Sequence, residues 1–348
     1  MIDKKKYSTI EKRKLNISLA LLRMYLSFLV VNAHLFDVNN SIIKNKYLLK
    51  FLKNKISVPI FFIMSFFFNH KSISSKDKIK IKKRFERLLI PYFIWPIIIF
   101  VVNNIVYYTF KLKLKITFKD LYIQYKTGHN IVAVLWFQLN LIISTLLILF
   151  IQILFPSSIL FILFNLQILS FFIQYSHFNY QIFSKYNRYI KYPYGRFMEI
   201  LPYCIIGYII SYLNIIVYLK QFYLKAIYTL NLILLFFTKY NIIEGTKGFM
   251  YQGFKLNIIS LIIFLIVALL PSEKITNIYI IKIIKIFTNF TSGVYYLHIP
   301  MYKYVSNYII LIKRKDIFGC LIIYMICYFI SFLGLKFFSK TKLVNLFL

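Results

Sequence analysis

Long uninterrupted apolar runs constrain this chain more than any other feature of its sequence. A helix needs about 20 residues to cross a hydrocarbon core of about 30 Å. Four runs are this long, and they occupy residues 15–36, 88–110, 131–154 and 318–338. Apolar residues follow one another within them and do not alternate with polar residues, which favours membrane-spanning helices over the strands of a barrel. We therefore expect an all-α integral membrane protein.

Further apolar runs bring the expected number of transmembrane helices to about ten. They occupy residues 56–69, 157–175, 197–213, 224–237, 256–270 and 287–311. Internal repeats, flexible linkers and an appended soluble domain are not evident. The sequence thus predicts a basic N-terminus at 1–14, one transmembrane domain at 15–338 and a C-terminal tail at 339–348.

The net charge of +34 would suggest a nucleic-acid partner in a soluble protein. Here the lysines are spread over almost every loop, and no compact basic domain or nucleic-acid motif is present. We expect no nucleic-acid partner, and membrane lipids with anionic headgroups are the natural contact for this charge. The three cysteines all fall inside apolar runs, without paired spacing, so the sequence predicts no metal site.

Two basic segments predict the orientation of the chain in the cell membrane. Six Lys or Arg residues lie between positions 4 and 14, and eight more lie between positions 71 and 87. Because cytoplasmic segments next to spanning helices are rich in Lys and Arg, we expect a multi-pass protein with a cytoplasmic N-terminus.

The first long run carries two ionisable residues, Arg23 and His34. An offset of eleven residues places them on nearly the same face of a helix, roughly 16 Å apart along its axis. A charged guanidinium within a membrane span costs about 2.5 to 3.5 kcal/mol, so it needs a polar partner or a hydrated cavity. We expect this stripe to form a wall of an active site in which His34 acts as a general base, with Asp37 placed to orient it. A structural role for His34 is the alternative.

Arg84 and Arg87 begin the next long run at a spacing of three residues, so both project from one side of a helix. Two guanidiniums near a helix N-terminus form a strong phosphate site. The alternative is ordinary anchoring of the helix at the cytoplasmic surface.

Six motifs follow one another along the chain. They are Arg23 and His34 separated by ten residues, SVPIFFIMS at 57–65, Arg84-x-x-Arg87 followed by LLIPY, Leu135-Trp136-Phe137, LPYCIIGY at 201–208, and SGVYYLHIP at 292–300. Their order resembles that of the integral-membrane acyltransferase 3 family, over residues 16–338. Within that family the chain looks like the members that modify surface polysaccharides, including the intercellular-adhesion polysaccharide type.

This resemblance implies a membrane-bound O-acyltransferase. It would move an acyl group, acetyl or succinyl, from cytoplasmic acyl-CoA to a hydroxyl of an extracytoplasmic glycan, with acyl-CoA as co-substrate and no bound cofactor. By position, His34 would be the catalytic histidine with Arg23 as its partner, and Arg84 and Arg87 would contact the CoA phosphates.

Four further residues are candidates for the site. His298 matches a second histidine motif of the family, although its place before Pro300 also fits a structural role. Ser65 is followed by Phe66 where the family usually has Ser-Gly, so we expect the close helix approach there to be lost or displaced. Glu199 is an acidic residue in an apolar run, with pairing to Arg196 as the alternative. Trp136 belongs to the motif that opens the run at 131–154.

The main alternative is an exporter of polysaccharide or lipid-linked sugar that performs no chemistry. Arg23 and His34 would then line a transport pathway, but paired broken helices in an inverted repeat are not evident in the sequence. A silent assembly subunit is a third class. In the enzymatic interpretation, partners include polysaccharide-synthesis machinery, and loops 37–55 and 111–130 select the acceptor.

Overall fold

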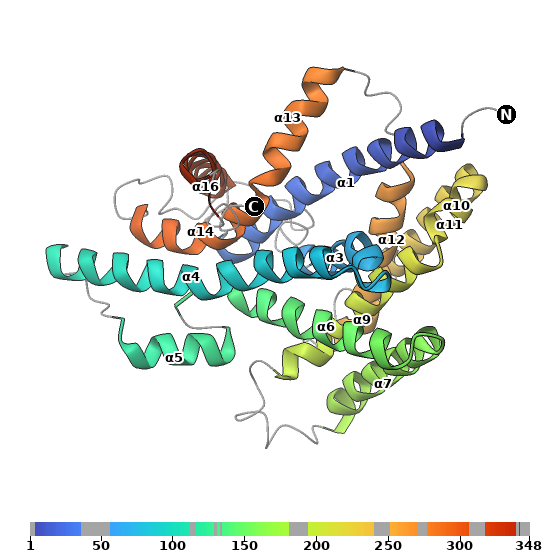
Figure 1. Ribbon diagram of the computed structural model, residues 1–348, viewed down its shortest axis with the longest axis horizontal. Coiled ribbons are helices and arrows are strands. Elements are labelled where there is room, and N and C mark those ends of the chain that lie inside the picture. Colours follow the sequence, from blue (N-terminus) through green and yellow to red (C-terminus); the bar gives the residue numbers. More distant parts are fainter. Residues whose placement is uncertain are drawn as a thin grey trace.

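The computed structural model describes residues 4–35, 56–110, 116–128, 131, 132, 134–180, 194–239, 251–270, 277–305, 317–338 and 341. Every regular element within these ranges is an α-helix (Figure 1). The helices are α1 (Lys4–Leu35), α3 (Ser57–Ser74), α4 (Lys78–Phe110), α5 (Phe118–Thr127), α6 (Leu135–Leu154), α7 (Ile159–Tyr180), α9 (Tyr194–Tyr212), α10 (Ile215–Gln221), α11 (Tyr223–Lys239), α12 (Tyr251–Leu269), α13 (Ile278–Asn289), α14 (Thr291–Val305) and α16 (Ile317–Phe338).

Four of the described helices are long and apolar enough to cross a membrane, and they correspond to the runs at 15–36, 88–110, 131–154 and 318–338. They are Ile17–Leu35, Lys78–Thr109, Leu135–Leu154 and Ile317–Phe338. The pair α9 and α10, bent by 60° at its junction, would make a fifth. The expected all-α membrane fold is therefore confirmed, whereas the expected count of about ten spans is not.

Two hydrophobic cores organise the bundle, and α1 contributes to both. Residues from the first half of its apolar stretch pack in a core with α3, α6, α7, α9 and α12. Its last residues, from Val30 to Leu35, pack in a second core with α4, α14 and α16. Phe61, Leu88 and Phe137 touch both cores, so they mark the boundary at which the two halves of the bundle meet.

The closest helix approach in the first core is between α3 and α9, and a glycine makes it possible. A Cβ atom at Gly207 would lie only 2.2 Å from the carbonyl oxygen of Ile63. Phe66, which occupies the position where a glycine was expected, is fully buried. The close approach is therefore displaced: Gly207 on α9 provides it, one turn of α3 away from Phe66.

Residues 111–130 were expected to form a loop, but they contain the helix α5. Thr117 and Asp120 form a capping box at its start, and Gly128 ends it in the left-handed conformation with φ of 67°. Two tyrosines fasten α5 to α4, because the Tyr92 hydroxyl donates to the carbonyl of Tyr125 and the Tyr125 hydroxyl donates to the carbonyl of Phe93. Figure 1 shows α5 lying alongside α4. The other expected loop, 37–55, lies outside the described residues.

The expected helix at 287–311 is interrupted at its start. α13 ends at Asn289, Phe290 forms a turn, and α14 begins at Thr291. α13 projects away from the bundle near α1, whereas α14 lies against the middle of it (Figure 1). The break places the beginning of α14 beside the middle of α1, which is where the candidate site lies.

Candidate active site

A cavity of about 550 Å³ lies at the boundary between the two cores, with walls from α1, α3, α4, α6 and α14. Its volume falls within the range of small-molecule sites. Five cationic side chains line it, and none of its lining residues is acidic. They are Arg23, Lys80, Lys83, Arg84 and Arg87. The three arginines selected from the sequence therefore share one cavity, together with Ser65.

Arg23 enters the cavity from α1 and is held by α14. Its Nη2 atom donates a hydrogen bond of 2.9 Å to the hydroxyl of Ser292. One turn further along α1, the Ser27 hydroxyl lies 2.9 Å from the hydroxyl of Tyr324. The first half of the predicted polar stripe on α1 thus finds its partners on α14 and α16.

Arg84 is 7% exposed, and its guanidinium is hydrogen-bonded to other residues of the chain. Its Nε and Nη2 atoms donate to the Thr145 hydroxyl at 3.1 and 2.9 Å, and Nη1 reaches the carbonyl of Ser65 at 3.4 Å. The guanidinium carbon lies 5.0 Å from the centre of the Phe66 ring, within cation–π range. Arg84 therefore joins α3, α4 and α6 in addition to lining the cavity.

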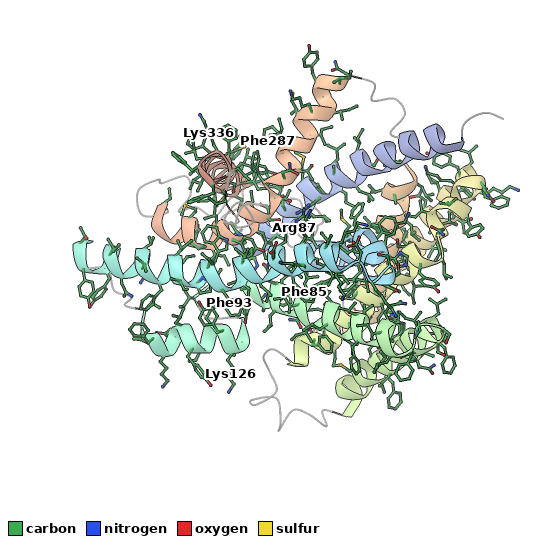
Figure 2. The ribbon with its side chains drawn as sticks, in the orientation of Figure 1. Phe85, Arg87, Phe93, Lys126, Phe287 and Lys336 are labelled. Carbon is green, nitrogen blue, oxygen red and sulfur yellow. The ribbon has the colours of Figure 1, made fainter. Side chains whose placement is uncertain are left out.

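Arg87 differs from Arg84 although it lies one turn along the same helix. Its side chain is exposed and extends from the face of α4 nearest α1 (Figure 2). Lys83 is also exposed, and within the described part of the chain neither side chain makes a hydrogen bond or an ion pair. Arg23 and Arg87 both line the cavity, so their two positive charges face the same space.

Asp77 shapes the start of α4 at the mouth of the cavity. Its carboxylate accepts hydrogen bonds of 3.1 Å from the backbone amides of Ile79 and Lys80 and pairs with the Lys80 ammonium at 2.8 Å. The hydrogen bond from the Lys80 side chain, with those from the amides, lowers the pKa of Asp77. The positive charge of Lys80 is therefore partly neutralised by Asp77, whereas Lys83 is not paired with Asp77.

Gln138, Tyr295 and Tyr296 line the cavity and were not among the site residues selected from the sequence. The Gln138 amide donates to the Leu88 carbonyl at 2.7 Å and accepts a hydrogen bond from the Tyr296 hydroxyl. The Tyr295 hydroxyl donates to the carbonyl of Val134 at 3.2 Å. A buried amide inside an apolar run was the available signal for Gln138, and the two tyrosines lie within the quoted SGVYYLHIP motif.

His34 and His298 form a pair beside the cavity, and neither of them lines it. Their ring centroids are 5.2 Å apart. His298 is fully buried, and its Nδ1 atom lies 3.1 Å from the carbonyl oxygen of Val294. Since a carbonyl can only accept, Nδ1 carries the proton; the opposite nitrogen, Nε2, has no hydrogen-bond partner among the described residues. Of the predicted stripe on α1, Arg23 lines the cavity, whereas His34 is not among the described residues that line it.

The remaining candidates lie away from the cavity. Trp136 is buried in the first core. A Cβ atom at Gly128 would collide with the Trp136 backbone, so Trp136 occupies a structural position. Glu199 is half-buried near the start of α9 and does not line the cavity. The Arg196 side chain and all of Asp37 lie outside the described residues. His, Cys, Asp and Glu do not gather into a metal-binding group within the described ranges.

Comparison with known protein families gives one match that covers most of the chain. The model of the acyltransferase domain of the acyltransferase 3 family matches residues 16–340. Comparisons with curated proteins and with solved structures give no match. The match includes the cavity, the histidine pair and all the helices that position them. The chain therefore belongs to the acyltransferase 3 family and is a membrane acyltransferase.

Proposed function

We propose that this acyltransferase moves an acetyl or succinyl group from acyl-CoA to a hydroxyl of a cell-surface or lipid-linked polysaccharide. The assignment of acyl-CoA as donor rests on the cavity, which has five cationic side chains and no acidic side chain among its described lining residues. Acyl-CoA carries several phosphate charges at one end and a reactive thioester at the other. A cation-lined site of this size suits such a molecule, because charge-assisted hydrogen bonds to phosphate are strong.

Some of the cationic side chains are available to a ligand, and others stabilise the helices that form the cavity wall. The side chains of Arg87 and Lys83 are exposed and make no hydrogen bond with the described residues, so they are the proposed phosphate contacts. Arg84 supports them by fixing α4 to α3 and α6 through Ser65 and Thr145. Arg23, held by Ser292, lies where the arm that carries the thioester would pass toward the histidine pair.

The histidine pair supplies the proposed acid–base chemistry. With Nδ1 of His298 donating to Val294, its Nε2 is an acceptor beside the His34 ring. His34 takes the proton of the sugar hydroxyl, the hydroxyl oxygen forms the new ester bond, and the thioester C–S bond breaks. The proton then passes to the departing CoA thiolate, so the step needs no further reactant. A route in which His34 first receives the acyl group gives the same products.

The proposed orientation follows from the basic segments of the sequence. Lys80 and Lys83 belong to the segment that we expect in the cytoplasm, so acyl-CoA would enter from that side. His34 lies eleven residues further along α1 than Arg23, toward the opposite surface, where an extracytoplasmic glycan would arrive. The proposal includes two further points. The acceptor is a surface polysaccharide, as in the family members that the chain resembles, and the protein associates with polysaccharide-synthesis machinery.

The test uses the purified full-length chain in liposomes, with labelled acetyl-CoA or succinyl-CoA on one side and isolated cell-surface polysaccharide on the other. We expect label to appear in the polysaccharide as an alkali-labile ester, and His34→Ala protein to give none. Movement of glycan across the bilayer without transfer of label would support the exporter instead. The absence of both activities would overturn the proposal in favour of an assembly subunit.

A further inference from the structure

Tyr295 links the cavity to the histidine pair. It lines the cavity, and its ring centroid lies 6.2 Å from that of His298, one turn further along α14. His298 in turn pairs with His34, and neither histidine is among the described residues that line the cavity. A thioester that moves from the cavity toward His34 along this side of α14 meets the Tyr295 ring.

The Tyr295 ring is fixed from two sides. Its hydroxyl donates to the carbonyl of Val134, just before α6 begins, and its ring packs at 5.2 Å against that of Phe137, which also lines the cavity. The side chain is 8% exposed. An aromatic ring held by packing and by a hydrogen bond presents a fixed surface to the cavity.

We propose that Tyr295 is the specificity-determining residue for the acyl group: its ring closes the cavity on the histidine side and sets the size of acyl group that can reach His34. This inference rests on the proposed transfer from acyl-CoA and deepens it. Small acyl groups pass the ring with little displacement, whereas longer chains collide with Tyr295 and Phe137. In a packed apolar site one methylene changes discrimination by about 10- to 200-fold, so replacement of one ring has a measurable effect.

The experiment follows the release of free CoA thiol in membrane vesicles that contain the full-length protein and the cell's own glycans. Acetyl-, butyryl- and hexanoyl-CoA are compared, and vesicles with His34→Ala protein give the background rate. We expect wild-type protein to use acetyl-CoA best. Tyr295→Ala should raise the hexanoyl-to-acetyl rate ratio by about tenfold or more. Tyr302→Ala removes a tyrosine of the same helix that does not line the cavity, and it should leave the ratio at the wild-type value.

Two further variants keep the inference falsifiable if Tyr295→Ala does not fold, as judged by a monodisperse peak in detergent. Tyr295→Leu retains an apolar side chain there, and Phe137→Leu removes the ring that supports Tyr295. Both should shift the ratio in the same direction. Folded variants with an unchanged ratio would overturn the role of Tyr295 and leave the proposed function standing. A wild-type protein that releases thiol from none of the three thioesters would overturn the proposed function, and this inference with it.

Discussion

The cavity and the histidine pair accommodate polar groups inside the bundle by different means. Around the cavity, positive charge is in excess. Arg84 is buried and hydrogen-bonded to Thr145, Arg23 is hydrogen-bonded to Ser292, and the side chain of Arg87 is exposed. At the pair, His298 is fully buried, and one of its nitrogens has no hydrogen-bond partner among the described residues. In the proposed function, the first region binds an anion and the second exchanges a proton. Substitutions in the two regions should therefore change different kinetic constants.

The largest expected effect belongs to the histidine pair. His34→Ala should lower the rate of acyl transfer by about 10² to 10⁴, the usual contribution of a general base, while the affinity for acyl-CoA stays unchanged. Single-turnover transfer gives the rate, and binding of a CoA thioether that cannot react gives the affinity. Ala33→Ser, a small change at the neighbouring position of α1, is the control and should react at the wild-type rate. A His34→Ala protein that binds the donor more weakly and reacts at the normal rate would contradict the separation of the two regions.

The next effect concerns the wall of the cavity. Arg84→Ala removes charged hydrogen bonds to Thr145 and Ser65, each worth about 1.5 to 3 kcal/mol, so we expect a clear loss of stability. Thermal unfolding followed by fluorescence-detected size exclusion measures it. Lys82→Ala, an exposed position outside the cavity on the same helix, should unfold at the wild-type temperature. If Arg84→Ala unfolds normally and only loses donor affinity, then Arg84 is a ligand contact and not a structural link.

Arg87→Ala should act on the donor alone. Loss of one charge-assisted contact of about 1.5 to 3 kcal/mol would raise KM for acyl-CoA by about 10- to 100-fold and leave kcat and the unfolding temperature near their wild-type values. The effect should shrink for a short pantetheine thioester that lacks the nucleotide phosphates. An equal rise in KM for both thioesters would place Arg87 near the thioester and not at the phosphates.

The smallest effect lies at the mouth of the cavity. Asp77→Asn removes the carboxylate that pairs with Lys80, so Lys80 becomes available to the donor. Exposed ion pairs contribute little, and we expect the affinity for acyl-CoA to rise by less than about fivefold. Asparagine can still accept the hydrogen bonds from the backbone amides of Ile79 and Lys80, so α4 should begin as before. Titration at low and high salt measures the change, which should disappear at high salt because screening weakens exposed charges.

The sequence predicts the parts of this molecule that depend on local pattern. The four helices that are long and apolar enough to cross a membrane follow from apolar length. A site that contains Arg23, Arg84 and Arg87 was expected from the family resemblance, and these arginines and Ser65 line one cavity. The different surroundings of Arg84 and Arg87 could not be predicted, because residues three apart share one side of a helix and only the position of α6 decides which one is buried. Tyr295 was not foreseen for the same reason: its importance depends on α6 and the histidines together.

Two local features were nevertheless readable and were missed. Thr117 and Asp120 have capping-box spacing, and Gly128 is a typical helix end, which together indicate α5 within the expected loop. The break at Phe290 also has a local mark, because Thr288, Asn289, Thr291, Ser292 and Gly293 surround it, and a cluster of such residues between apolar segments is typical of a loop or break. Just after the break, Ser292 accepts a hydrogen bond of 2.9 Å from Arg23.

Gln138 connects three helices at a single buried point. It donates to the carbonyls of Arg87 and Leu88 on α4, accepts from Tyr296 on α14, and belongs to α6. A displacement of any one of these helices must stretch this junction or carry the other two along. In the proposed function, donor binding near Arg87 and the position of the Tyr295 ring would therefore be coupled through Gln138 before any bond is made or broken.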